Sequence, residues 1–343
     1  MATDATESGI GIFTTNKKSG SRSESSSQVR KKRKLAPWIF PESAVLTRSP
    51  TRLDSKLTIS QELRIKESMH DFLIKLGSKL KVDAPTILAA TVYIHRFYMR
   101  VPITSSKYYV ASAALAISGK LNDCVRQSDT ISLYACNIKA PRTSSSSSSS
   151  SSKFPPNTAN HSAAQPPPPP PPQIDEQSEY FWRWRDQLLY REELILRKLN
   201  FDLSFPSPYL LQHKILNKMH AGINQTFYEK RKDIMVRTTR LIELLSSLPI
   251  ILCYDMNVLF ATCLVMVVFE GKSTFSDMKM PENFITKVVE VDLEDVMKCF
   301  EFIKKLLNFS QQDPHSYSNK TAAKRILGIK TSDFEQVAKG API

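Results

Sequence analysis

The hydrophobic residues of this chain recur at steps of three and four positions, which is the spacing of one face of an α-helix. A first helix is predicted to start near Ser60. Asp83 as an N-cap and Pro85 in the first turn predict a second helix that ends before Pro102. The apolar stripe of the first helix consists of Ile65, Met69, Phe72, Leu73, Leu76 and Leu80.

A third helix is predicted over residues 107–121, where the small side chains of "ASAALAISG" let other helices approach its backbone closely. Such a helix belongs in the middle of a bundle. No alternating strand pattern of convincing length is found in the sequence. The remaining helices are predicted at 128–138, 179–199, 208–220, 229–248, 257–269, 282–289 and 293–308.

These helices form two successive sets of five, each about 100 residues long, as expected for a two-domain chain. We therefore predict an all-α protein made of two tandem five-helix units. The predicted boundaries are 37–203 for the first unit, 204–310 for the second and 311–343 for a C-terminal tail.

Two low-complexity runs, Ser144 to Ser152 and Pro166 to Pro172, interrupt the first unit. The segment 140–177 has too little apolar surface to repay the entropy of ordering it, so we predict a disordered insertion there. Residues 1–36 are rich in Ser, Thr and Lys and are predicted to be a disordered arm for the same reason.

The formal net charge of +14 raises the question of nucleic-acid binding. Up to Pro37 there are eight Lys and Arg against three Asp and Glu, an excess of five, so much of the charge lies in the arm. A short basic cluster on such an arm predicts a nuclear import signal, although it could also touch phosphates weakly. The cluster consists of Arg30, Lys31, Lys32, Arg33 and Lys34.

The sequence gives little indication of a disulfide-bonded protein, a membrane protein or an enzyme. The five cysteines are odd in number and lack Cys-x-x-Cys spacing, which favours reduced thiols inside the cell. The longest apolar run, Asn257 to Phe269, is shorter than the ~20 residues that cross a bilayer, so a membrane span is not expected. No Gly-rich phosphate loop, metal-ligand motif or catalytic signature is found, so we expect no cofactor, no metal and no enzymatic activity.

The stretch "TILAATVYIHRFYMR", Thr86 to Arg100, places His95 and Arg96 side by side in an apolar helix. Such a pair could belong to a catalytic centre or could be structural. Because His95 has no Ser, Cys or acid at a recognisable motif spacing, the sequence favours a structural role.

Five short motifs, taken in order, resemble those of cyclins. "WIF" begins at Trp38, "LTRSPTR" at Leu46, "YIHRFYM" at Tyr93, "SGKL" at Ser118 and "REELILRKLNFDL" at Arg191. The Trp-x-Phe and Ser-Pro-Thr-Arg elements, and His rather than Asp before Arg-Phe, are similar to transcriptional cyclins of types T and K. The similarity spans about residues 37–310 apart from the insertion, and it is sharp only in the first unit.

The resemblance implies two tandem cyclin folds and a non-catalytic role. By this similarity the chain is a regulatory subunit in the nucleus that activates a cyclin-dependent kinase acting in RNA polymerase II elongation. Lys120 and Glu192 match the cyclin residues that bind the kinase. An apolar anchor for the kinase, or alternatively plain core, consists of Phe181, Trp182, Leu188 and Leu189. The structural residues of the cyclin box would be Tyr93, His95, Arg96 and Phe97.

The sequence also allows a second function and departs from the family pattern at the end of the third helix. A nucleic-acid-binding transcription factor built from cyclin folds is the alternative function, and it needs basic and aromatic residues gathered on one folded face. The chain departs from the family at Gly119, which weakens the end of the third helix by up to ~1 kcal/mol relative to Ala. The sequence also leaves open whether Ser49, which precedes Pro50, is phosphorylated.

Overall fold

The computed structural model describes residues 38–104, 106–140, 174–219, 224–312 and 320–340, and in these ranges it contains helices and no strand. The predicted all-α class is confirmed. The predicted import cluster lies outside the described residues. In chain order the elements are α1 (Glu42–Thr47), α2 (Pro50–Ser55), α3 (Ile59–Leu80), α4 (Ala84–Phe97), α5 (Lys107–Leu121), α6 (Ser128–Lys139), α7 (Glu179–Lys198), α8 (Pro208–Lys218), α9 (Gln225–Glu229), α10 (Arg231–Leu245), the 3₁₀-helix η1 (Pro249–Leu252), α11 (Met256–Lys272), the π-helix η2 (Ile285–Val289), α12 (Leu293–Gln311), α13 (Lys320–Gly328) and α14 (Thr331–Lys339).

Local capping fixes where the first long helices begin. Thr58 and Gln61 form a reciprocal capping box ahead of α3, which satisfies two backbone N–H groups that have no partner inside the helix. The Asp83 carboxylate accepts a hydrogen bond from the Thr86 amide at 3.1 Å, which confirms the predicted N-cap of α4. These caps set the start of the helices whose apolar faces build the first core.

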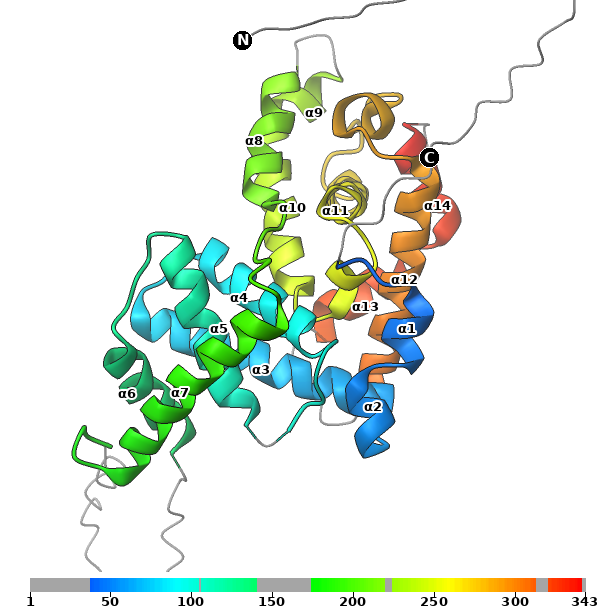
Figure 1. The fold of residues 1–343 in the computed structure, drawn as a ribbon. Coiled ribbons are helices and arrows are strands. Elements are labelled where there is room, and N and C mark those ends of the chain that lie inside the picture. The colour runs from blue at the N-terminus through cyan, green and yellow to red at the C-terminus, as the bar shows by residue number, and fades with distance from the viewer. Residues whose placement is uncertain (1–37, 105, 141–173, 220–223, 313–319, 341–343) are drawn as a thin grey trace, which may run out of the picture. The chain divides into compact units, whose positions relative to one another are not determined.

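Helix α5 occupies the centre of the first group of helices, as predicted, and packs against α3, α4, α6 and α7 (Figure 1). Its Ala111, Ala113 and Ala114 are completely buried. Because these side chains are small, neighbouring helices can contact α5 on most of its circumference. The first core contains Phe72, Leu73, Leu76, Phe97, Trp184, Leu188 and Ile195 around this helix.

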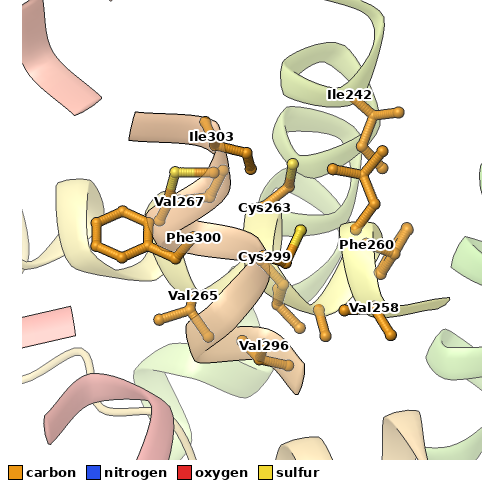
Figure 2. Packing of buried hydrophobic residues seen from close by; sticks show 14 of the residues in the cluster. Ile242, Val258, Phe260, Cys263, Val265, Val267, Val296, Cys299, Phe300 and Ile303 are labelled. Carbon is orange, nitrogen blue, oxygen red and sulfur yellow. The ribbon is translucent and has the colours of Figure 1, made fainter. Parts of the chain in front are cut away.

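A second core forms around α11, the apolar helix predicted near residues 257–269. Side chains of α11 meet those of α10 and α12, among them Ile242, Cys263 and Phe300 (Figure 2). Helix α11 is buried on most sides and also packs against α8 and α14. The division of the chain into two cyclin folds stays a prediction, although the buried residues do form two clusters.

The segment predicted as a C-terminal tail contains two helices, α13 and α14. Phe334 of α14 is fully buried and stacks on Phe300 of α12 with the ring centroids 3.9 Å apart. Ile326 of α13 and Val337 of α14 also belong to the second core. The two helices escaped the sequence analysis because each has only nine residues, too few to show a clear period.

The predicted insertion is tied to α6 where it rejoins the folded chain. The side-chain amide of Asn137 donates to the carbonyl of Ile174 at 2.9 Å, and its oxygen accepts from the Ile174 amide at 2.8 Å. Ile174 packs against the first core, so it belongs to the fold although the predicted insertion, 140–177, includes it. Residues 141–173 lie outside the described part of the chain.

Two histidines connect α3 and α4 to the end of α10. His95 Nε2 lies 2.7 Å from the Ser246 carbonyl oxygen, and His70 Nε2 lies 3.0 Å from the Ser246 hydroxyl. Burial lowers the pKa of His70 to about 4, and burial together with the nearby Lys66 charge lowers the pKa of His95 to about 3. Both imidazoles are therefore neutral in the folded protein near neutral pH.

These histidines predict that the protein loses stability in mild acid. Unfolded histidine titrates near pH 6.5, so below that pH the unfolded chain binds protons that the folded chain excludes until its pKa values of about 4 and 3 are reached. Each histidine then costs about 1.4 kcal/mol of unfolding free energy per pH unit. Urea unfolding between pH 6.5 and 5 should show this fall, and His70→Gln with His95→Gln should flatten it. An equal slope in the double variant would contradict the assignment.

Candidate functional site

Lys120 and Glu192, predicted on separate helices, meet at the surface of the first group of helices. Lys120 Nζ at the end of α5 lies 2.8 Å from Glu192 Oε1 on α7. The lysine side chain is 54% exposed whereas that of the glutamate is 10% exposed. The carboxylate is thus held in place by the fold, and the ammonium keeps free hydrogen-bond donors that face solvent.

Two apolar side chains at or beyond the ends of the helices that carry this pair are exposed, and neither was predicted from the sequence. Leu121 follows Lys120 and is 53% exposed, and Phe201 beyond the end of α7 is 70% exposed. Asn200 and Phe201 both have left-handed backbone, with φ of 52° and 57°. Such φ values cost non-glycine residues of order 1 kcal/mol or more, so the chain accepts strain where Phe201 projects outward. A cavity of about 530 Å³ lies between Leu121, Phe201 and Tyr209.

The four residues predicted on α7 as an apolar anchor separate into two pairs. Phe181 and Leu188 are buried in the first core, at 1% and 0% exposure, so the anchor prediction is wrong for these two residues. Trp182 and Leu189 are exposed by 49% and 41%. Both pairs have heptad spacing, and the packing of α5 and α6 on α7 decides which pair turns inward.

Gly119, which the sequence analysis treated as a weak point of α5, is required by the fold. A β-carbon at this position would lie 2.9 Å from the carbonyl oxygen of Cys124. The Cys124 amide donates to the Gly119 carbonyl at 2.9 Å, so the chain folds back closely against the end of the helix. The glycine therefore fixes the backbone from which Lys120 projects.

His95 and Arg96 are buried and bonded to carbonyl groups of other segments. Because a carbonyl oxygen can only accept, the Ser246 contact shows that His95 Nε2 carries the proton, which leaves Nδ1 buried without a hydrogen-bond partner among the described residues. The imidazole is fully buried and bonded to a backbone carbonyl, which favours a role in packing over one in contact with a substrate. Arg96 donates to the Asp202 carbonyl at 3.3 Å and lies over the Trp38 ring. Tyr93 and Phe97 are buried in the first core.

The motif around Trp38 meets the motif at the end of α7. Trp38 Nε1 donates to Asp202 Oδ2 at 2.9 Å, and the Phe40 amide donates to the Leu252 carbonyl at 2.6 Å. Phe40 packs against both cores. The segment before α1 thereby holds the two groups of helices together.

A buried charge cluster occupies the junction of α2 and α3. Glu62 accepts from the Ser49 hydroxyl at 2.5 Å and lies 2.8 Å from Lys66 Nζ and 3.3 Å from the Arg52 guanidinium. Burial alone would raise the pKa of Glu62, but Lys66, Ser49 and Arg52 outweigh it and lower the pKa. Ser49 is 1% exposed and its hydroxyl also caps α2, so in the folded protein a kinase cannot reach it.

Metal ligands, membrane-spanning helices and reactive thiols were also considered among the described residues. They hold no group of His, Cys, Asp or Glu that could bind a metal ion, and no helix among them is long and apolar enough to cross a membrane. Burial raises the pKa of Cys136 to about 11 and that of Cys299 to about 12. These thiols stay protonated near neutral pH and act as packing residues.

Comparison with known proteins finds a family that matches part of the chain. Residues 42–149 match the family described as "Cyclin, N-terminal domain". This part of the chain is therefore similar to a cyclin N-terminal domain, which confirms the resemblance seen in the motifs.

Several cyclins are similar to the chain. Cyclin pch1 of Schizosaccharomyces pombe is 28% identical over 173 residues, which cover 50% of this chain and 42% of the relative. Cyclin-T1-4 of Arabidopsis thaliana is 26% identical over 210 residues, covering 60% and 34%, and Cyclin-T1 of Mus musculus is 25% identical over 222 residues, covering 63% and 26%. The chain thus spans less than half the length of these relatives.

Among solved structures, a chain of the yeast RNA Pol II CTD kinase CTDK-1 complex is similar over 82% of this chain and 78% of its own length. The TM-score is 0.48 and the sequence identity is 13%.

The buried cluster yields a stability prediction. Replacing Glu62 by Gln should lower the free energy of unfolding by about 3–5 kcal/mol, because Lys66 and Arg52 would remain buried without their counter-ion. As a control, Glu294→Gln removes an exposed pair with Lys298 and should cost less than about 1 kcal/mol. Urea unfolding followed by helical circular dichroism measures both values. Equal costs would show that the buried cluster contributes no more than a surface pair.

Proposed function

We propose that this chain is a non-catalytic cyclin that binds and activates a cyclin-dependent Ser/Thr kinase in RNA polymerase II transcription elongation. The observation that carries the proposal is the ion pair of Lys120 and Glu192 at the surface of the first group of helices, in a chain whose residues 42–149 match the cyclin N-terminal domain. The similarity to cyclins of the T type and to pch1 supports the transcriptional role.

The proposed kinase-binding face combines fixed charges with exposed apolar side chains. Lys120 can donate to backbone carbonyls of the kinase, and the Glu192 carboxylate can accept from its amides. Leu121 at the end of α5 and Phe201 beyond the end of α7 are exposed, while Trp182 and Leu189 extend the apolar surface along α7. Exposed aromatic and aliphatic side chains next to partly buried charges are typical of the centre of an interface.

Activation then follows from positioning rather than from chemistry in this chain. A kinase needs its Lys–Glu pair and its Mg²⁺ ligands in place before it transfers phosphate efficiently. A partner that binds the regulatory helix of the kinase favours the conformation in which that pair forms. We infer that the polymerase tail and elongation factors are phosphorylated by the kinase and contact this chain only indirectly.

A charge-exchange experiment tests the face. Lys120→Glu and Glu192→Lys should each weaken kinase binding by roughly thirtyfold or more, since a wrong buried charge at an interface costs about 2–5 kcal/mol. The double variant restores the internal ion pair but presents each charge to the wrong kinase group. It should therefore recover thermal stability without recovering binding. Recovery of both would show that the pair serves only the fold of this chain.

The kinase for this measurement is obtained by capturing the tagged protein from nuclear extract, where a stoichiometric kinase subunit is expected. Phe201→Ser should also weaken binding, whereas Leu210→Ser on α8, whose side chain is similarly exposed at 71%, is the matched control. If no kinase is recovered and the chain instead binds nucleic acid with an affinity that falls steeply with salt, the result would support the nucleic-acid alternative.

The basic cluster at residues 30–34 yields a separate prediction on localisation. Replacing the five basic residues by alanine should move the protein out of the nucleus, because such a cluster is the type of segment that import receptors bind. The melting temperature should stay unchanged, since the first core is built from residues after Pro37. Fluorescence microscopy of the tagged variant measures the distribution. Unchanged nuclear enrichment would remove this assignment.

A further inference from the structure

A cavity of about 340 Å³ lies between α3, α4 and α10, and none of the residues assigned above to kinase binding lines it. Its apolar walls come from Ile74 on α3, Ile87 and Leu88 on α4, and Leu244 on α10. Ile74 is 45% exposed although it belongs to a helix that is otherwise well packed. The volume falls in the range of specific binding pockets.

The polar groups of this cavity are of two kinds. Glu243 accepts from the Tyr209 hydroxyl at 2.8 Å, and His70 is bonded to the Ser246 hydroxyl. Asp71 on α3 and Arg240 on α10 have no hydrogen bond or ion pair with any residue in the described part of the chain. The cavity thus presents the Asp71 carboxylate on the α3 wall, and on the α10 wall the Arg240 guanidinium together with the Glu243 carboxylate, which is bonded to Tyr209.

The cost of this arrangement falls on Asp71, because Arg240 is exposed to solvent. Asp71 is half-buried, and burial together with Glu67 raises its pKa, while Lys75 and Lys139 oppose that shift more weakly. A cation bound at the cavity would relieve the desolvation of Asp71 and an anion would pair with Arg240. The apolar walls require a nonpolar group between these two charges.

We propose that the cavity binds a peptide segment of a partner protein in which a bulky apolar side chain is flanked by one basic and one acidic residue. The apolar side chain enters between Ile74, Leu88 and Leu244. The basic flank faces Asp71 and the acidic flank faces Arg240. Charges of opposite sign on two walls select a partner mainly by excluding peptides with like charges.

Dye-labelled synthetic peptides test this assignment by fluorescence anisotropy. Each peptide carries a central Phe, and the two flanks are Lys and Glu, Lys and Lys, or Glu and Glu at matched spacings. The full chain should bind the mixed peptide about tenfold more tightly than either like-charged peptide, which corresponds to about 1.4 kcal/mol. Equal affinities, or no binding of any peptide, would overturn the proposal.

Variants of the two walls sharpen the test. Asp71→Arg leaves Glu243 as the one carboxylate among the lining residues and should shift the preference to the Glu/Glu peptide, while Arg240→Glu removes the guanidinium and should shift it to the Lys/Lys peptide. Asp54→Arg on α2 is the control, because Asp54 is exposed and does not line the cavity. Circular dichroism melting shows that each variant is folded. Preferences that do not follow the wall charges would overturn the assignment even if the wild-type chain binds.

Discussion

Folding buries the Glu62 carboxylate, the Lys66 ammonium and the His70 imidazole of helix α3. The need to pair these groups determines which distant segments lie against the helix. Unpaired, each charged group would cost several kcal/mol. Glu62 obtains partners from Ser49 and Arg52 at the start of the chain, and His70 obtains its partner from Ser246 at the end of α10. Because these partners come from different segments, satisfying α3 also fixes α2 and α10 in place.

Much of the fold could be predicted because its signals are local. The run of small side chains predicted the bounds of α5, and the cap at Asp83 predicted the start of α4. Helices of six to nine residues, such as α2 and α14, are too short to show that period. Their positions depend on contacts such as Phe334 with Phe300, which join residues far apart in sequence.

The candidate site shows the same division between local and distant information. The motifs placed Lys120 and Glu192 on two helices, but only the packing of α7 on α5 brings them to 2.8 Å. Phe181 and Trp182 are neighbours with similar side chains, and burial separates their roles. Phe201 could not be found from the sequence, because its exposure results from left-handed backbone at two successive residues.

The paired hydrogen bonds between Asn137 and Ile174 have a practical consequence for protein engineering. They hold the two chain ends that flank residues 141–173 beside the first core, whatever sequence joins them. Loop-closure free energy grows only slowly with length, so the core tolerates very different connections here. A reporter domain whose own termini lie close together can therefore replace this segment. It would report on this protein in cells without adding a tag to either end of the chain.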